Sequence, residues 1–442
     1  MLNKNYRYNC QHLFELLIKN DIKFWLVAGT LLGSVREHNF IEHDADIDIG
    51  IWAEDIQKFK EVIEASSWQY FQIWRREIGI IRHCSTRAES KIDVFIFDKD
   101  DKYAYMYSYM KNPNSNIWDT EWRMKFPVEL FDELVPCHID SIKCFRPKEA
   151  EKILALHYTD DWKTPDKQWS NDKIPIIDTD YKELAIIIPT FLRDDKLKVL
   201  IDSIKENIHN KKYRLYIADQ GLYTLEKDQY YSELQKEGHK ASFLPFNCGL
   251  SYTRNFLVSQ TVEPFILLID DDFIFTNETI IQNYIYILNS RLDLGVVGGK
   301  LQGRESYFYN LLKTDTNFYH IKVNPKEWYH STKTYLLPPI RFWYADIVLN
   351  FSMFKREVFN EHHWDDDLKM AEHTYFYYTL MLLKKWKVAF TDTVTTEHQD
   401  ELKNTTIYNL YRKDFNSVLG MKVLNKKMNL KDSSYIVLGD TK

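Results

Sequence analysis

Apolar residues in the first third of the chain recur with the period of a helix in some segments and of a strand in others. Leu13, Phe14 and Leu17 share one face of a predicted helix. Isoleucines alternate with polar residues over 47–51, as in a half-buried strand. These periods predict a mixed α/β unit that extends to about Trp162. Its other expected elements are a strand over 24–28, a turn over 29–34, a helix over 56–63 and a strand over 91–97.

A second pattern begins after a polar stretch. Residues 163–183 contain two prolines and no sustained period, which predicts a linker. Beyond it, apolar runs at 184–188 and 213–218 flank a helical stripe at 197–204. This β–α–β order is typical of a mostly parallel sheet that binds ligands at the carboxyl ends of its strands. We therefore expect a first domain over 1–165, a linker over 166–182, a second domain over 183–400 and a helical tail over 401–442.

Composition narrows the class of protein. The chain has 442 residues, of which 45% are hydrophobic and 28% charged, as in folded multidomain proteins. Its formal net charge of −6 offers no basic excess for nucleic-acid phosphates. The five cysteines are scattered and form no CxxC pair, so we expect a reducing cytoplasm and neither a disulfide scaffold nor structural zinc. The apolar runs are too short to predict a membrane span, which needs about 18 residues.

Aspartates are concentrated between residues 44 and 48. Asp44, Asp46 and Asp48 alternate along one predicted extended segment, so their side chains are expected on one face. Neighbouring carboxylates repel unless water or cations separate them, and oxygen ligands suit Mg²⁺ or Mn²⁺. Asp93 adds a carboxylate inside another apolar strand, where a lone charge is costly to bury. The spacing is compatible with a metal site for phosphoryl transfer, and also with a solvated edge strand.

The residues around these aspartates carry a family signature. They are Gly29-Thr30-Leu31-Leu32-Gly33, Arg36, Phe40-Ile41 and Asp44-Ala45-Asp46-Ile47-Asp48-Ile49. The tract resembles the LicD/fukutin family of phosphotransferases, and weaker similarity extends to about residue 165. The resemblance implies a nucleotidyltransferase-like fold that transfers a phospho-alcohol or sugar phosphate from a nucleotide donor. Ala45 departs from the all-acid triplet that is frequent in the family.

The resemblance also implies roles for individual residues of the first domain. Asp46 and Asp48 would bind the metal, and Asp93 would be the third catalytic carboxylate. The donor would be contacted by residues of the glycine-containing segment and by one cation, namely Gly29, Thr30 and Arg36.

A second acidic run, Asp270-Asp271-Asp272, directly follows the apolar run at 265–269. An Asp-x-Asp at the carboxyl end of a strand can bind a divalent cation and, through it, a nucleotide diphosphate. Short acidic runs also occur in solvated loops, so the motif alone leaves both interpretations open.

Further blocks surround this run in a characteristic order. They are Thr190–Arg193, Ile217–Asp219, Leu244–Leu250, Arg254-Asn255, Val297–Gly299, Asp346–Phe351, Trp364–Lys369, Glu372-His373 and Glu397-His398. The series resembles GT-A glycosyltransferases over residues 183–400, particularly β-1,4-N-acetylgalactosaminyltransferases of the ganglioside-synthase type and their family-2-like relatives. The resemblance implies an inverting enzyme with a UDP-sugar donor, a glycan acceptor and Mn²⁺ or Mg²⁺. Asp270 and Asp272 would bind the metal and the diphosphate, and His398 would complete the metal shell.

The other expected roles in the second domain concern donor and acceptor. Asp219 would contact the uridine, with Arg193 and Arg254 nearby. Glu372 would be the general base for the acceptor hydroxyl, although a solvated helix residue is the alternative. His373 is expected to be a core residue. Two positions depart from the family pattern: Gln220 stands where an Asp often follows, and Tyr375 stands where relatives often carry an acid.

Together the halves predict a bifunctional enzyme of bacterial surface-polysaccharide synthesis. One site would transfer a sugar, and the other a phospho-group from a second nucleotide-linked donor. The alternatives are a glycosyltransferase whose N-terminal half only binds the acceptor, and a non-catalytic glycan-binding protein. A nucleic-acid nucleotidyltransferase is disfavoured because no basic, aromatic-interleaved tract is present.

The tail contains an apolar pattern among lysines. Tyr408, Leu410, Tyr411, Phe415 and Val418 predict an amphipathic helix packed on the second domain. Peripheral contact with the inner face of a membrane is the alternative.

Overall fold

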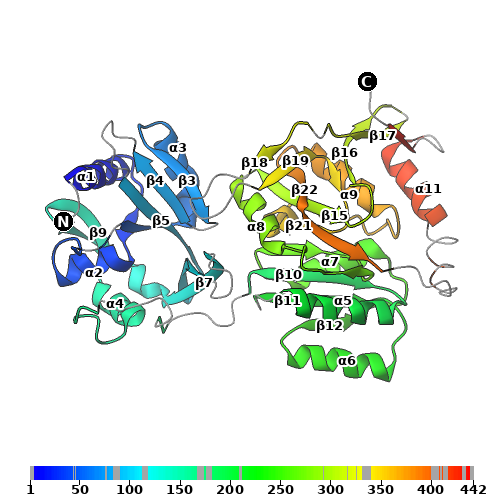
Figure 1. Cartoon of the computed structure of the whole chain (residues 1–442), viewed down its shortest axis with the longest axis horizontal. Coiled ribbons are helices and arrows are strands. Elements are labelled where there is room, and N and C mark those ends of the chain that lie inside the picture. Colours follow the sequence, from blue (N-terminus) through cyan, green and yellow to red (C-terminus); the bar gives the residue numbers. More distant parts are fainter. Residues whose placement is uncertain are drawn as a thin grey trace. The chain divides into compact units, whose positions relative to one another are not determined.

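The chain forms two compact units, Met1–Tyr181 and Lys182 onward (Figure 1). Residues 332–338, which group with the first unit, lie outside the described residues. The computed structural model describes residues 4–42, 44, 46–74, 77–82, 90–111, 118–166, 174–175, 182–208, 212–291, 293–315, 317–324, 326–330, 340–399, 408, 411, 417–430 and 435–438.

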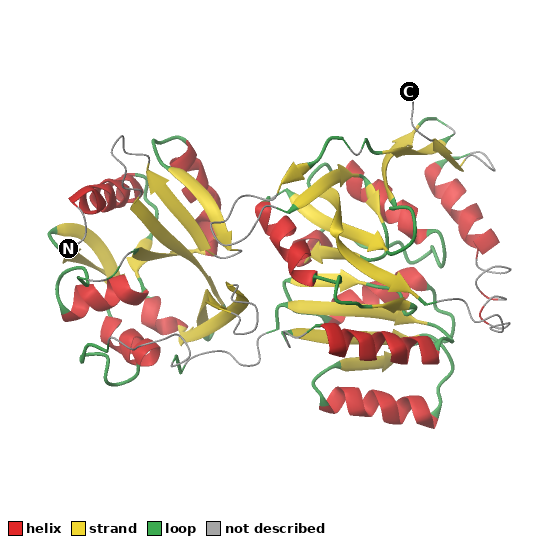
Figure 2. Cartoon of the chain, in the orientation of Figure 1, coloured by secondary structure: helices red, strands yellow, loops and turns green. Residues whose placement is uncertain are grey.

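The first unit is built on a seven-stranded sheet (Figure 2). Its strand order is β1-β2-β5-β4-β3, with β6 beside β5 and β7 beside β6. Only β2 and β5 pair in parallel among these described strands. The strands are β1 (Phe24–Leu26), β2 (Ile47–Trp52), β3 (Gln69–Trp74), β4 (Glu77–Arg82), β5 (Ser90–Lys99), β6 (Tyr103–Lys111) and β7 (Trp118–Pro127). The other elements are the hairpin β8 (Leu134–Ile139) and β9 (Ile142–Pro147), and the helices α1 (Lys4–Lys19), α2 (Ala28–Arg36), α3 (Ile56–Glu64) and α4 (Ala150–Tyr158).

Strand β2 is buried along its whole length, whereas the alternating pattern predicted a half-buried strand. It lies between β1 and β5, and the Trp25 and Phe97 rings pack against it at Gly50. A Cβ at Gly50 would collide with Trp25 and Phe97, so the glycine lets these rings approach the strand. The polar positions of β2 are therefore buried as well.

Residues 28–36 form helix α2, and the predicted turn over 29–34 is wrong. The prediction rested on Gly29 and Gly33, but Leu31 and Leu32 between them are buried, which favours a packed helix. Gly33 lies so close to the Asn39 carbonyl that a Cβ would be 2.6 Å from that oxygen. Its role is close packing rather than reversal of the chain.

The predicted linker is partly packed on the first unit. Ile174 is buried in the hydrophobic core that β2 and α4 share. Residues 167–173 and 176–181 lie outside the described residues.

The second unit contains a ten-stranded sheet in the order β12-β11-β10-β13-β21-β15-β22-β19-β18, with β14 beside β22. The first four strands are parallel, as expected, but β21 is antiparallel to both of its neighbours. The strands are β10 (Leu184–Thr190), β11 (Tyr213–Asp219), β12 (Lys240–Phe243), β13 (Phe265–Leu268), β14 (Phe273–Ile274), β15 (Leu294–Leu301), β18 (Tyr329–His330), β19 (Arg341–Ala345), β21 (Ser352–Lys355) and β22 (Lys387–His398). The helices are α5 (Asp194–Asn207), α6 (Leu225–Lys236), α7 (Leu250–Gln260), α8 (Ile281–Ser290) and α9 (Glu372–Leu382).

A smaller sheet includes the end of the described chain. Its order is β20 (Ile347–Val348), β16 (Phe308–Lys313), β17 (Phe318–Lys322) and β23 (Tyr435–Leu438). The tail forms helix α11 (Ser417–Met428) and then β23, which pairs in parallel with β17, so it is not helical throughout. Of the predicted amphipathic face, Leu410 and Phe415 lie outside the described residues.

Candidate functional site

Three carboxylates of the first unit converge, as the sequence predicts. One oxygen each of Asp46, Asp48 and Asp93 lies within 4.8 Å of the others. Asp48 and Asp93 are directly paired across the parallel strands β2 and β5, and both are buried. In the described part of the chain this is the only such group of three His, Cys, Asp or Glu ligands. Buried like charges this close are costly unless a cation lies between them, and three oxygen ligands suit Mg²⁺ or Mn²⁺.

The start of helix α2 is fixed to this cluster. The Asp48 backbone N–H donates to the Thr30 hydroxyl oxygen at 2.8 Å, and Thr30 is buried. Asp44 does not share an extended segment with Asp48, because β2 begins only at Ile47. The Asp44 carboxylate instead lies against Gly29, where a Cβ would overlap it. The glycine therefore lets a fourth carboxylate approach the N-terminus of the helix.

A cavity of about 950 Å³ opens beside these carboxylates. Its lining includes Gly29, Asp46, Asp48, Arg36 and Tyr158. This volume is in the range of ligand-binding pockets. Of the predicted donor contacts, Gly29 and Arg36 thus border the same cavity as the predicted metal ligands Asp46 and Asp48, whereas Thr30 and Asp93 do not line it.

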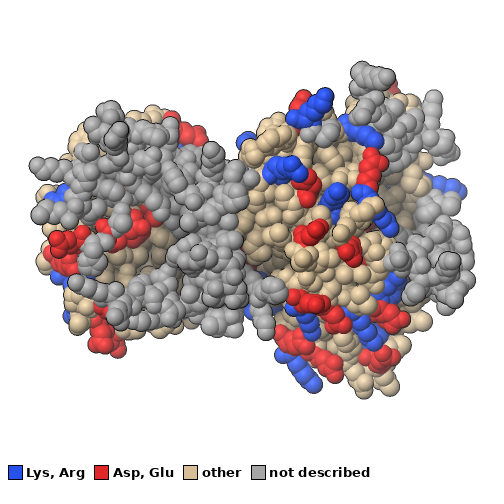
Figure 3. Space-filling view, viewed as in Figure 1, with Lys and Arg blue, Asp and Glu red and all other residues tan. Residues whose placement is uncertain are grey.

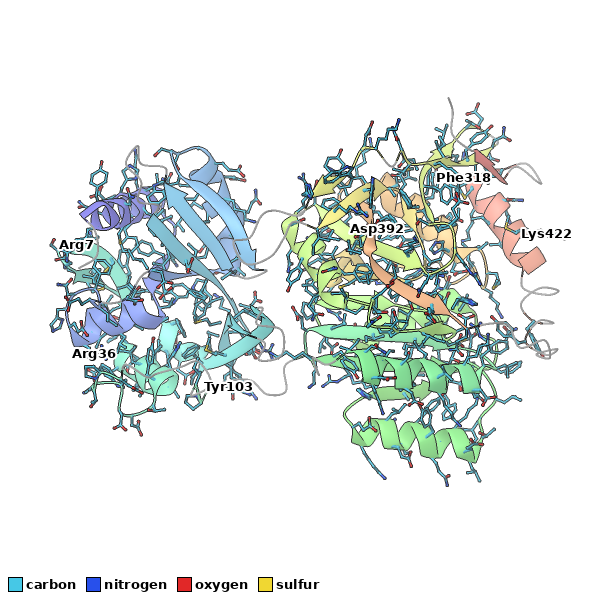
Figure 4. The ribbon with its side chains drawn as sticks, in the orientation of Figure 1. Arg7, Arg36, Tyr103, Phe318, Asp392 and Lys422 are labelled. Carbon is cyan, nitrogen blue, oxygen red and sulfur yellow. The ribbon has the colours of Figure 1, made fainter. Side chains whose placement is uncertain are left out.

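Arg36 lies at the end of α2 (Figure 4). Its guanidinium donates to the Trp162 carbonyl at 3.3 Å and pairs with Glu37 at 2.7 Å. A phosphate would therefore have to share the guanidinium with Glu37.

Sequence reasoning gave Tyr158 no role, although this residue lines the cavity. Burial, followed by the charges of Asp48 and Asp44, raises the pKa of its hydroxyl far above the ordinary value. A neutral phenol can donate a hydrogen bond towards the carboxylates. The sequence gives little indication that Tyr158 lies near the carboxylates, because it is the last residue of α4, more than 100 residues from Asp48.

The acidic run of the second unit follows β13 and is held by Arg193. The guanidinium pairs with both Asp271 and Asp272, and the Thr190 hydroxyl donates to Asp271 at 2.7 Å. Burial raises the pKa of Asp271 to about 6, against the opposing charge of Arg193. The middle aspartate is thus a buried structural group.

Asp272 also meets His398. The His398 Nε2 lies 3.2 Å from an Asp272 oxygen, and the buried Nδ1 has no hydrogen-bond partner among the described residues. Burial alone would raise the pKa of Asp272, but the His398 hydrogen bond and the charge of Arg193 lower it well below its ordinary range. An Asp272 oxygen and the His398 Nε2 this close can be ligands of one divalent cation.

Asp270 is the most exposed aspartate of the run, with 28% of its side chain accessible. Its oxygen is 3.6 Å from Arg254. Asp270, Asp272 and His398 do not form a three-ligand group like that of the first unit. The structure brings together only Asp272 and His398 of the predicted metal shell.

Glu372 lies in the first turn of α9 and is only 4% exposed. Its carboxylate pairs with Arg254 at 2.6 Å, and Arg254 is completely buried. The predicted solvated alternative is wrong because this ion pair buries the residue. A general base must reach the acceptor hydroxyl, and this carboxylate is engaged by Arg254 instead.

Asp219 ends β11 and is completely buried. One oxygen accepts from the Gly221 N–H at 2.7 Å, and the other accepts from Lys227 and Tyr231, each at 2.9 Å. The predicted uridine contact would have to replace one of these partners. Sequence reasoning missed Lys227 and Tyr231, which come from the next helix, α6.

Gln220 and Tyr375, which depart from the family pattern, and His373 each have a defined environment in the second unit. The Gln220 side-chain oxygen accepts from the Gly249 N–H at 2.8 Å, at the start of α7. Tyr375 is half-buried in α9. Burial lowers the pKa of His373 to about 3, which agrees with its interpretation as a core residue.

Charges on the visible face of the second unit are mixed (Figure 3). Lys, Arg, Asp and Glu are interspersed there, without a continuous basic patch on the described part of that face. Among the described helices, none is long and apolar enough to cross a bilayer.

Comparisons with known proteins match each half separately. Residues 21–149 match the family model described as LicD/FKTN/FKRP, nucleotidyltransferase domain, and residues 185–362 match Glycosyl transferase family 2. Both resemblances expected from the motifs are confirmed. The second unit therefore carries a glycosyltransferase domain, and the α/β fold class is confirmed.

Individual relatives cover only parts of the chain. A 133-residue segment is 33% identical to mouse β-1,4 N-acetylgalactosaminyltransferase 2, covering 30% of this chain and 24% of that enzyme. A 180-residue segment is 24% identical to human ribitol-5-phosphate transferase FKTN, covering 38% of this chain and 36% of that enzyme. Among solved structures, Staphylococcus aureus TarS 1–349 in complex with UDP-GlcNAc matches with a TM-score of 0.36 and 17% identity, over 50% of this chain and 59% of that one.

Proposed function

We propose that this chain, in which a LicD/FKTN/FKRP nucleotidyltransferase domain precedes a family 2 glycosyl transferase domain, is a bifunctional enzyme of glycan synthesis. The second domain would transfer a sugar from a UDP-sugar to a glycan. The first domain would transfer a phospho-alcohol or sugar phosphate from another nucleotide donor. The convergence of Asp46, Asp48 and Asp93 beside the large cavity carries the proposal of a second activity.

In the first domain, Asp46, Asp48 and Asp93 would hold divalent cations. Such ions supply charge that neutralises the phosphates and the departing nucleotide. The N-terminus of α2 adds backbone N–H groups where a phosphate is favoured, and a phosphate there would have to displace the Asp44 carboxylate that lies against Gly29. Tyr158 would orient either the carboxylates or the bound phosphate by donating its hydroxyl proton in a hydrogen bond.

In the second domain, Asp272 and His398 would hold a cation that supplies charge to the diphosphate, with Asp270 as a further ligand. Arg193 already forms an ion pair with Asp272. Its Nε–H has no hydrogen-bond partner among the described residues and can donate to a phosphate oxygen. We propose that its guanidinium exchanges Asp272 for the diphosphate when the donor binds. Asp219 would position the uridine through Lys227, whose ammonium group donates a hydrogen bond to the Asp219 carboxylate.

Glu372 is the predicted general base, but its ion pair with Arg254 favours a positioning role. In that role it would fix Arg254 beside Asp270 and so hold the acidic run in place. The two roles differ in their kinetics. Loss of a base reduces kcat, whereas loss of a positioning residue weakens donor binding.

The test is a donor screen with the full chain, Mn²⁺ and a panel of UDP-sugars and other nucleotide-linked phospho-donors. We expect Asp272→Asn to abolish sugar transfer and Asp46→Asn to abolish only phospho-group transfer. The exposed Asp315→Asn and Asp101→Asn are the matched controls. If Asp46→Asn changes no product, the first domain is an acceptor-binding module instead. If neither variant changes any turnover, the bifunctional proposal is wrong.

A further inference from the structure

Two cysteines that the sequence separates by seven positions meet across the hairpin β8–β9. Cys137 and Cys144 are directly opposite each other in the antiparallel register, and their sulfurs are 3.3 Å apart. Opposed residues of an antiparallel pair have Cα atoms about 4.5–5.5 Å apart, which is within the range of a disulfide. Both cysteines are free thiols in this structure. The hairpin therefore needs only a small side-chain rotation to form an S–S bond.

The environments of the two thiols differ. Cys137 is half-buried, whereas Cys144 is completely buried. The Cys144 hydrogen bond lowers the pKa of Cys137, and Arg146 contributes in the same direction despite the opposing effect of burial. The pKa of Cys144 is raised, first by that hydrogen bond and then by burial. A partly exposed thiol with a lowered pKa, beside a buried second thiol, is the arrangement of a redox-active pair.

The other described cysteines, Cys10 and Cys248, make no such sulfur–sulfur contact with described residues, although Cys10 lies near enough to Cys144 to contribute to its raised pKa. Cys10 is completely buried and burial raises its pKa well above the ordinary value, so it is a poor nucleophile. The pKa of Cys248 in the second unit is also raised, first by burial. Among the four cysteines that the structure describes, reactivity should therefore be confined to the hairpin.

We propose that Cys137 and Cys144 are a reversible oxidation site, in which Cys137 is the attacking thiol and Cys144 the resolving thiol. The oxidant is a hydroperoxide. The Cys137 thiolate attacks the peroxide, the O–O bond breaks, and Cys137 becomes a sulfenic acid while hydroxide leaves. The Cys144 sulfur then attacks the Cys137 sulfur, the S–O bond breaks, and the Cys144 proton leaves with the oxygen as water. Overall, two thiols and one H₂O₂ give one disulfide and two waters, and a dithiol reductant reverses the change.

Oxidation would cross-link the two strands that precede α4. The hairpin packs against β1 and α1, and β9 continues into the helix that carries Tyr158. This inference does not depend on the proposed transfer reactions, because it rests only on the hairpin.

The experiment exposes the reduced full chain to one equivalent of H₂O₂ and alkylates the remaining thiols after denaturation. Trypsin cleaves after Lys143, so the two cysteines fall in different peptides that stay joined only by a disulfide. We expect the joined peptide, lighter by two hydrogens (~2 Da), and its disappearance on treatment with dithiothreitol. The matched control Cys248→Ser should behave like the wild type.

Single variants test the assigned order of attack. Cys144→Ser should leave Cys137 trapped as a sulfenic acid that a dimedone probe labels, whereas Cys137→Ser should give no label on Cys144. Equal labelling of both would overturn the assignment of roles. Oxidation of Cys10 or Cys248 before the pair, or no joined peptide from the wild type, would overturn the site itself. The wild-type measurement stands even if a variant folds poorly.

Discussion

Arg254 and Glu372 form a buried ion pair at 2.6 Å between residues 118 positions apart. Arg254 comes from α7 and Glu372 from the first turn of α9, so the pair joins the two helices beneath the acidic run. Arg254 also lies 3.6 Å from Asp270. Its charge is thus shared between a structural partner and a predicted metal ligand.

Removal of Glu372 should be costly for the second unit. Glu372→Ala leaves Arg254 buried without its closest partner, and we expect a loss of ~3–5 kcal/mol in the free energy of unfolding. Urea unfolding measures it, with the exposed pair Glu361–Lys385 as control, where Glu361→Ala should cost about 1 kcal/mol or less. A similar loss for both variants would contradict the buried role.

Glu372→Gln separates positioning from base catalysis. If Glu372 positions Arg254, the amide retains a hydrogen-bond acceptor, so kcat should persist while the KM for the donor rises. A fall of ~100-fold or more in kcat with unchanged KM would identify a general base instead.

Asp46→Asn should weaken Mn²⁺ binding by the first unit. One of three converging carboxylates becomes neutral, so we expect Mn²⁺ affinity to fall by at least ~10-fold, or ~1.4 kcal/mol. Electron paramagnetic resonance titration of free Mn²⁺ measures this directly. Asp93→Asn should have the same effect and Asp101→Asn none. Identical titrations of all four proteins would show that the cluster does not bind the ion.

Two glycines of the same helix should respond differently to alanine. A Cβ at Gly29 meets the end of the Asp44 side chain, which can rotate away, so Gly29→Ala should cost less than ~1 kcal/mol. A Cβ at Gly33 meets the backbone carbonyl of Asn39, which cannot move alone, so Gly33→Ala should cost ~1–3 kcal/mol. Unfolding midpoints in urea compare the two. The reverse order would mean that Asp44 is fixed in place.

Arg193→Met should strengthen Mn²⁺ binding at Asp272 in the absence of nucleotide. The guanidinium and the cation compete for the same carboxylate, so we expect a gain of ~10-fold. Calorimetry with Mn²⁺ alone measures it, and Arg341→Met, at an exposed pair, is the control. The same variant should bind UDP more weakly. Unchanged Mn²⁺ affinity would contradict the competition.

Continuous or alternating apolar runs made much of the sheet predictable. The core strands β10 and β13 are seven and four residues long, are apolar except for Thr190, and are buried throughout. The carboxylate cluster was predictable for a related reason, because Asp48 and Asp93 each interrupt such a run and must therefore be compensated.

Other features depend on contacts that no local pattern encodes. Helix α2 was not predicted because Gly29 and Gly33 suggested a turn. In the structure, Gly29 permits the close approach of the Asp44 side chain, and Gly33 permits the close approach of the Asn39 carbonyl. The engagement of Asp219 by Lys227 requires the placement of α6 on the sheet. Likewise, the meeting of Cys137 and Cys144 follows from the hairpin register and not from their spacing alone.

The pairing of β23 with β17 also has a consequence for biosynthesis. The edge of the small sheet at Phe318–Lys322 is completed by residues 435–438, which the ribosome adds more than a hundred residues later. Until then this edge presents unpaired backbone groups to the cell. The nascent second unit should therefore be most prone to aggregation, and most dependent on chaperones, during the interval between synthesis of the two strands.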